Sequence, residues 1–277
     1  VHHGRILAAG AVPLLQSLLN YGAQMRDRNG DEALDAAAMA LVNLCTGEAD
    51  VRQNIVQCGG MLTVSHVVQL TYPEEPSEAA LTSVLALLRS LVSTGADTAS
   101  EATLSGVEVT VPALVDLTVE GTAEGEVPVT TAHHIASAWI LSSLARMSPR
   151  FQALIFNAGG LPPLIKMLKC GEFKAATAAL AAISNLVAGN RTNTCAVREA
   201  LVIPIFTRLA SEFAGQPVAR NANRAIQELN LVLGPETRRA LKELKSTMGA
   251  VCNAEQRHSL WRRIELKAAL AQRIIPA

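Results

Sequence analysis

The fold is decided by the stretch between residues 159 and 186, which begins Gly159-Gly160-Leu161-Pro162-Pro163-Leu164-Ile165 and ends Ala182-Ile183-Ser184-Asn185-Leu186. A glycine can end a short helix in the left-handed conformation. A proline soon afterwards fits the first turn of the next helix, where its missing N–H would have no partner. The Ala- and Leu-rich second half lets neighbouring helices approach closely. The stretch therefore predicts helices joined by a sharp corner and packed side by side.

The same pattern recurs five times along the chain. Its first half appears again at Gly10, Gly59 and Gly106, and the fifth copy, around Pro204, lacks the glycine. Its second half ends each time in a polar residue followed by Leu, at positions 43, 90, 143, 185 and 228, which are 47, 53, 42 and 43 residues apart. Such a period suits two or three helices per repeat. The two longer intervals contain segments of loop composition, residues 72–77 and 120–126.

Composition supports a helical repeat. Hydrophobic residues make up 49% of the 277 residues and aromatic residues only 3%, so the apolar content is mainly Ala, Leu, Val and Ile. This favours closely packed helices over a β-sandwich, in which β-branched and aromatic side chains would dominate. The fold class predicted is all-α, a right-handed α-solenoid of about five repeats over residues 1–233, with residues 234–277 as a basic C-terminal helical cap or extension.

Charge is balanced overall and uneven in distribution. Lys plus Arg and Asp plus Glu each number 24, so no global field attracts nucleic acid or an anionic membrane. From residue 234 onward, however, nine basic residues stand against four acidic ones. We therefore expect a protein partner, and neither nucleic acid nor a membrane, for the solenoid.

The repeated Gly-x-x-Pro-Leu and Ala-x-x-x-Asn-Leu motifs resemble those of the armadillo repeat family, which includes β-catenin and importin-α. The resemblance covers roughly residues 5 to 232. It implies three helices per repeat, with the third helices lining a concave groove that binds extended or helical segments of a partner protein. By this resemblance the groove residues are Met39, Asn43, Ala86, Ser90, Trp139, Ser143, Ala181, Asn185, Arg224 and Glu228.

The resemblance leaves two interpretations of the groove. The first is a noncatalytic scaffold or adaptor, a subunit of a multiprotein complex, with a partner segment on its small-residue floor. The alternative is a transport adaptor of the importin-α type, which would stack tryptophans on the lysines of basic peptide signals. Only Trp139 matches such a tryptophan, and Ser143 replaces the accompanying Asn. A single aromatic gives little support to cation–π recognition.

Catalytic and metal-binding motifs are absent from the sequence. It contains no phosphate-binding loop, H-E-x-x-H helix or G-x-S-x-G elbow, so we expect neither an enzyme nor a cofactor. The paired histidines point about 100° apart on a helix, which argues against a metal site. Five dispersed cysteines without C-x-x-C spacing suggest a reducing, intracellular compartment, most simply the cytoplasm. The chain begins with Val1, and a lost targeting segment stays an open alternative.

The basic C-terminal segment carries a second candidate contact, formed by Arg257, Arg262, Arg263 and Lys267. A basic helix there could contact an acidic partner, an anionic lipid surface or RNA. The competing interpretation is a capping helix whose basic face is simply solvated, because solenoids need their last apolar face covered.

Overall fold

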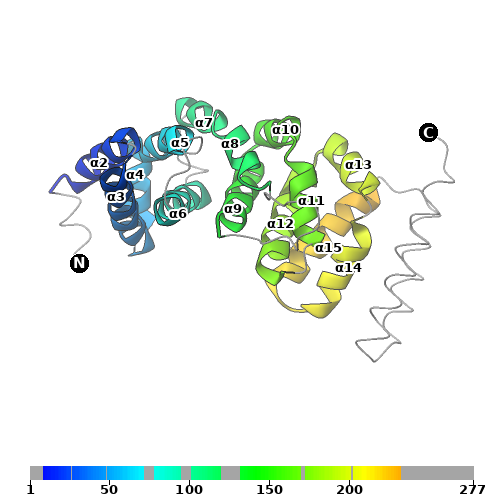
Figure 1. Cartoon of the computed structure of the whole chain (residues 1–277). Coiled ribbons are helices and arrows are strands. Elements are labelled where there is room, and N and C mark those ends of the chain that lie inside the picture. The colour runs from blue at the N-terminus through cyan, green and yellow to red at the C-terminus, as the bar shows by residue number, and fades with distance from the viewer. Residues whose placement is uncertain are drawn as a thin grey trace. The chain divides into compact units, whose positions relative to one another are not determined.

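The computed structural model describes residues 9–25, 27–47, 49–71, 78–94, 101–119, 132–169, 172–200 and 202–231. Within these ranges the chain is a succession of α-helices (Figure 1). The predicted loops at residues 72–77 and 120–126 and the predicted basic segment 234–277 lie outside the described residues. The predicted boundary after residue 233 therefore stays a prediction. No described helix is long and apolar enough to cross a membrane.

The helices follow a three-part order that repeats along the chain. Long third helices close the five repeats: α3 (Arg28–Gly47), α6 (Glu78–Thr94), α9 (Ala132–Met147), α12 (Phe173–Val187) and α15 (Pro217–Leu231). Each is preceded by a second helix: α2 (Ala11–Met25), α5 (Gly60–Thr71), α8 (Val111–Asp116), α11 (Leu161–Lys169) and α14 (Ile203–Glu212). Short first helices begin the later repeats: α4 (Ala49–Gln57), α7 (Glu101–Glu108), α10 (Pro149–Asn157) and α13 (Arg191–Glu199).

The chain forms two compact units, unit 1 (Val1–Ala182) and unit 2 (Ile183–Ala277), and the division falls inside α12. In unit 1, α2 packs against α3 and α5, and α3 packs against α6, which in turn packs against α9. The helices of unit 1 are thus stacked repeat upon repeat, with α3, α6 and α9 following one another along one side (Figure 1). In unit 2, α15 packs against α13 and α14.

Glycine corners begin most of the second helices. Gly10, Gly59 and Gly159 have φ values of +74°, +81° and +77°, which confirms the predicted left-handed conformation. Gly106 does not have a positive φ and lies inside α7, so the prediction of a left-handed corner there was wrong. Its physical role is a close approach, since a Cβ at Gly106 would lie 2.0 Å from Leu62 Cδ1.

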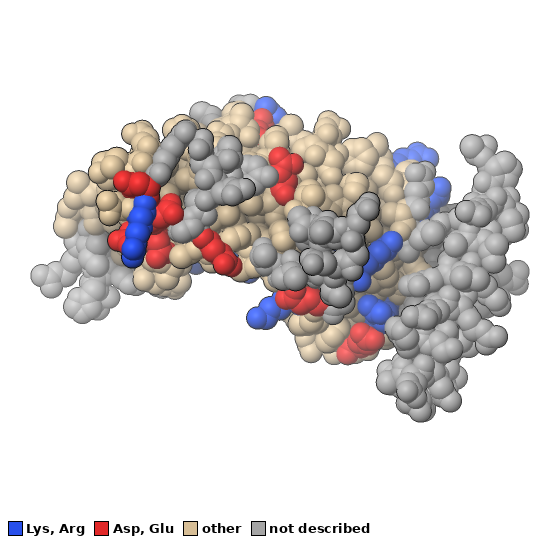
Figure 2. All heavy atoms as spheres, in the orientation of Figure 1, with Lys and Arg blue, Asp and Glu red and all other residues tan. Residues whose placement is uncertain are grey.

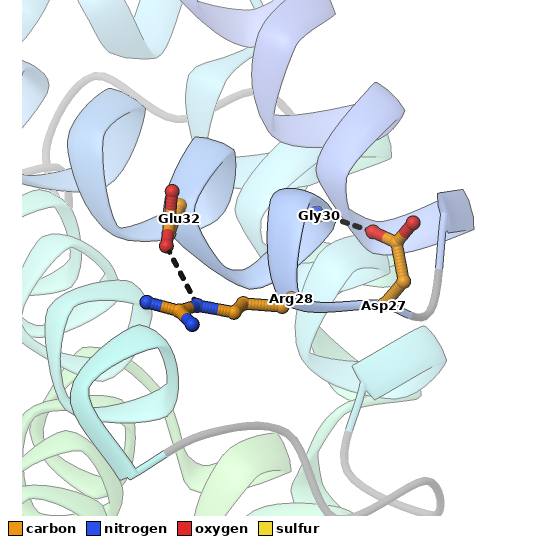
Figure 3. A network of polar contacts seen from close by, with 4 residues as sticks. All are labelled: Asp27, Arg28, Gly30 and Glu32. Carbon is orange, nitrogen blue, oxygen red and sulfur yellow. Dashed lines mark hydrogen bonds and ion pairs between the residues drawn. The ribbon is translucent and has the colours of Figure 1, made fainter.

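The crossing of α2 and α3 depends on two further glycines and on a helix cap. A Cβ on Gly22 would lie 2.7 Å from the carbonyl oxygen of Gly30, so these helices touch through their backbones. The Asp27 carboxylate accepts a hydrogen bond from the Gly30 N–H at 2.8 Å and so caps the first turn of α3 (Figure 3). One turn along the same helix, Arg28 pairs with Glu32 at 3.0 Å in an exposed contact that contributes little stability (Figure 3).

The core is aliphatic, as the composition predicts. Phe151 and Phe206 are the only aromatic members of its largest fully buried side chains, and the others are Leu, Ile and Met. The Ala-rich segment of α12 is buried almost throughout, at Ala175, Ala176, Ala178, Ala179 and Ala182. Small side chains at these positions let other helices approach α12 closely, as the sequence pattern indicated.

Candidate functional site

The predicted groove residues of α3, α6 and α9 lie on successive third helices of unit 1. Met39 is 43% exposed and Asn43 is also exposed, both on α3. The four corresponding residues on the next two helices are half-buried, namely Ala86 and Ser90 on α6 and Trp139 and Ser143 on α9. We call these six residues the third-helix face of unit 1. All of them lie on the elements expected, and all keep some surface accessible to a partner.

Side-chain contacts join the three helices that carry this face. The Ser83 hydroxyl of α6 donates to the Asp35 carboxylate of α3 at 2.5 Å. The Thr82 hydroxyl and His133 Nε2 of α9 lie 2.9 Å apart. Because each contact links residues about fifty positions apart in sequence, the helices are held in register by polar groups as well as by their apolar core.

The C-terminal halves of α6 and α9 bring two arginines to the same region. The guanidinium carbon of Arg89 lies 5.2 Å from the centroid of the Trp139 ring, a distance typical of a cation–π contact. Arg146 Nη2 donates to the Ser93 carbonyl oxygen at 3.2 Å, near the end of α6. A cation at a helix C-terminus is favourable because unpaired carbonyls give that end a partial negative charge.

The remaining predicted groove residues lie on α12 and α15. Ala181 is buried, and Asn185 is buried as well and contacts an arginine. In unit 2, Arg224 of α15 donates through Nε to the Ser184 hydroxyl at 3.1 Å and through Nη2 to the Asn185 amide oxygen. Glu228, one turn further along α15, is half-buried. The structure thus brings Asn185 and Arg224 together, and the Asn185 side chain that could bond a peptide backbone is engaged within the protein.

Sequence reasoning missed Arg89, Arg146 and Ser184 as neighbours of the predicted residues. Arg89 could have been found, because it follows Ala86 by three positions and therefore lies on the same side of α6. The contacts of Arg146 and Arg224 reach across repeats, and no local pattern predicts them. The predicted basic contact of Arg257, Arg262, Arg263 and Lys267 lies outside the described residues.

Acidic side chains gather over α3 in unit 1 (Figure 2). Asp27, Asp31, Glu32 and Asp35 occupy the beginning of this helix, with Arg28 as its cation there. Acidic residues in the first turns of a helix stabilise it, because the N-terminal end carries a partial positive charge. They do not form a metal site, because no three His, Cys, Asp or Glu side chains come together for a metal ion anywhere in the described ranges.

An apolar stripe on α2 is a further exposed feature of unit 1. Leu14, Leu18, Tyr21 and Met25 are 71%, 37%, 52% and 41% exposed. Their spacing of four, three and four residues places them on one side of the helix, and α2 carries no charged residue. Leu18 lies eight residues after the corner glycine Gly10. The residues at the same distance from Gly59 and Gly159 are Val67 of α5 and Met167 of α11, which are both buried. The same position is therefore covered in two later repeats and open in the first.

Comparison with known proteins identifies the repeat. Residues 148–188, which contain α10, α11 and α12, match the family described as Armadillo/beta-catenin-like repeat. No curated protein matches the chain in sequence. Among solved structures, a designed armadillo repeat protein in complex with the peptide (KR)4 is similar, with a TM-score of 0.62 and 20% identity, covering 82% of this chain and 85% of that one.

Two other solved structures have comparable similarity. Computationally designed armadillo repeat proteins for modular peptide recognition give a TM-score of 0.61 at 21% identity, over 82% of this chain and 85% of that chain. An engineered protein gives 0.63 at 15% identity, over 92% of this chain and 97% of that chain. The chain thus has the fold of an α-solenoid of armadillo-type repeats, and residues 148–188 match the armadillo repeat family. This confirms the predicted fold class and the predicted family resemblance.

Proposed function

We propose that the chain is a noncatalytic scaffold or adaptor that holds a segment of a partner protein along its third helices. The observation that carries this proposal is the third-helix face of unit 1, where three successive repeats present accessible side chains at corresponding positions. Repetition of equivalent positions along a solenoid suits an extended or helical partner segment, which can contact one repeat after another. The similar designed proteins, made for modular peptide recognition, support the same use of this fold.

The chemistry of the face fits a protein ligand. Met39 and Trp139 provide apolar surface, and the exposed Asn43 amide provides donors and an acceptor for a peptide backbone. The Ser143 hydroxyl donates to the Trp139 carbonyl oxygen at 3.1 Å and can still accept a hydrogen bond. Such a mixture of a few apolar anchors with hydrogen-bonding groups is typical of peptide-binding surfaces. The described side chains also offer no cluster of metal ligands that would suggest metal-assisted catalysis.

Membership of a larger assembly is the second part of the proposal, and it is supported by the stripe on α2. In unit 1, α5 packs against α2 of the preceding repeat, and Val67 is buried. The corresponding Leu18 is exposed together with Leu14, Tyr21 and Met25. An exposed apolar face of this kind, without charged residues, is typical of a protein–protein contact.

A transport adaptor for basic peptides is the weaker alternative. It needs an accessible aromatic ladder on the third helices, and the predicted positions provide one tryptophan. That tryptophan is Trp139, which already lies beneath Arg89 of the same chain. As the cellular setting we propose a reducing compartment, most simply the cytoplasm. Cys45, Cys58 and Cys195 are free thiols.

The proposal is tested by purifying the full chain with its bound proteins and repeating the purification with a variant face. Met39→Glu together with Asn43→Glu changes two exposed side chains of α3, so the fold should persist. The control is His66→Glu on α5, which is equally exposed. We expect the face variant to lose partners that the control retains. Equal recovery from both variants would refute a role for the third-helix face.

Salt separates the two modes of association in the same experiment. Partners held by apolar burial on α2 should survive high salt, whereas contacts that depend on exposed charges weaken as ions screen them. Replacing Leu18 and Tyr21 with Glu and Lys should release only the salt-resistant partners. If the isolated chain is a monomer that captures no protein under either condition, the scaffold proposal fails.

A further inference from the structure

Arg89 occupies the face of Trp139 that a basic ligand would need. The guanidinium carbon lies 5.2 Å from the ring centroid, on the next third helix of the stack. An aromatic ring attracts a cation over its face, and one cation fills that position. Trp139 therefore serves as a platform for an arginine of its own chain, and a lysine or arginine from a peptide would meet a like charge.

In α6 and α9, the described helices that carry Arg89 and Trp139, no carboxylate lies close to the Arg89 guanidinium. Among the described residues, α9 has no acidic side chain, and α6 has only Glu78 at its first position. Arg89 follows Glu78 by eleven positions, which places the two residues roughly 16 Å apart along the helix axis. Asp35 of α3 accepts from Ser83 instead. Arg146, the other cation of these helix ends, adds a second positive charge near Ser93.

The electrostatic balance of Arg89 agrees with this geometry. Desolvation by burial lowers the pKa of its guanidinium. The group is nevertheless charged at neutral pH, because an arginine pKa stays far above 7. A partly desolvated cation gains from a charge-assisted hydrogen bond to a carboxylate.

We propose that Arg89, placed over the ring of Trp139, binds a carboxylate in an acidic segment of the partner protein. The inference rests on the proposed function and names the chemistry of its ligand. The ring contact restricts the position of the guanidinium, whose N–H donors suit a bidentate contact with a carboxylate. Charge selection on this face is therefore opposite to that expected for a site that stacks peptide cations on tryptophan.

The test uses two labelled octapeptides of opposite charge, (Glu-Asp)4 and (Lys-Arg)4. The full chain carries two tryptophans. A Trp261→Phe background leaves Trp139 as its only tryptophan, so that its fluorescence reports binding at this site, while anisotropy of the label gives the affinity. In low salt we expect (Glu-Asp)4 to bind about tenfold more tightly than (Lys-Arg)4 and to perturb Trp139.

Two variants separate a specific contact from general charge. Arg89→Gln should weaken (Glu-Asp)4 by about tenfold and, by uncovering the ring, should strengthen (Lys-Arg)4. Lys169→Gln, an exposed change on α11 that removes the same charge, should leave both affinities within about twofold. Circular dichroism checks that each variant keeps the helical fold.

Three results would overturn the inference. They are a wild-type preference for (Lys-Arg)4, equal effects of Arg89→Gln and Lys169→Gln, and no response of Trp139 to either peptide. Failure here is distinguishable from failure of the scaffold proposal. If natural partners are lost on changing Met39 and Asn43 but not on Arg89→Gln, the face binds proteins and only its selectivity for carboxylates is wrong.

Discussion

The contact between α2 and α3 makes a sharp prediction about two glycines. Gly22→Ala would place a Cβ 2.7 Å from the Gly30 carbonyl oxygen and 2.8 Å from Leu34 Cγ, where ordinary contacts begin at 3.4 Å. The obstacle is a backbone atom and the buried Leu34, so the helices must separate. Overpacking of this kind costs about 1 to 3 kcal/mol, and the better helix propensity of Ala returns up to about 1 kcal/mol. Because both close contacts involve atoms that cannot simply rotate away, the cost should lie in the upper part of its range, about 2 to 3 kcal/mol, which leaves a net loss of about 1 to 3 kcal/mol.

Gly106→Ala is the matched control, because it also adds one methyl group to a glycine inside a helix. Its Cβ would meet only Leu62, first at Cδ1, which is the end of a side chain that is 47% exposed. Leu62 can rotate away, so the gain in helix propensity should leave the variant as stable as the wild type or slightly more stable.

Urea unfolding followed by circular dichroism measures both variants. The urea concentration at the midpoint should fall for Gly22→Ala, while the dependence of the unfolding free energy on urea concentration stays constant. The midpoint for Gly106→Ala should stay the same or rise. The reasoning would be refuted by an equal response of the two variants, or by a stable Gly22→Ala protein, since either result would mean that the backbones of α2 and α3 are not in contact.

The remaining predictions concern a corner, a buried amide and two thiols. Gly159→Ala should lower the free energy of unfolding by about 1 to 2 kcal/mol, because a Cβ disfavours the positive φ found there; thermal melts beside Gly106→Ala test this. Asn193→Ala removes the hydrogen bond that the buried Nδ2 donates to the Leu186 carbonyl oxygen at 3.0 Å. The free energy of unfolding, measured in urea, should fall by about 1 to 3 kcal/mol, and a loss below about 0.5 kcal/mol would contradict this. Burial raises the pKa of the Cys45 thiol, whereas Cys58 is exposed. Iodoacetamide should therefore modify Cys58 first and Cys45 only on unfolding, which peptide mass spectrometry would show. Similar rates of modification at the two thiols would contradict the burial of Cys45.

Much of the fold could be predicted from sequence because local steric chemistry determines the corners. Gly159 needs a left-handed backbone, and Pro162 tolerates only the first turn of a helix, so the start of α11 could be placed from these two residues. The five polar residues before leucine also marked all five third helices. At Gly106 the same reasoning failed, because that glycine lies inside α7 and does not form a corner.

The candidate site was less predictable, since its important contacts link different repeats. The resemblance placed Trp139 and Asn185 on third helices, and the structure agrees. It could not indicate that Arg89 covers Trp139 or that Arg224 engages Asn185. Those contacts depend on the register between third helices some forty to fifty residues apart, which is set by core packing and not by any motif in one helix.

The central claim is that the third helices of unit 1 carry the partner, and site-specific photo-crosslinking tests it most directly. A benzophenone amino acid replaces Asn43 on the third-helix face or, as control, exposed His66 on α5, and the full chain is irradiated with its co-purified partners. The account predicts a discrete cross-linked protein from position 43, mapped to one continuous segment of that partner, and none from position 66. Cross-linking from position 66 alone would contradict the account and would place the partner on the opposite helices.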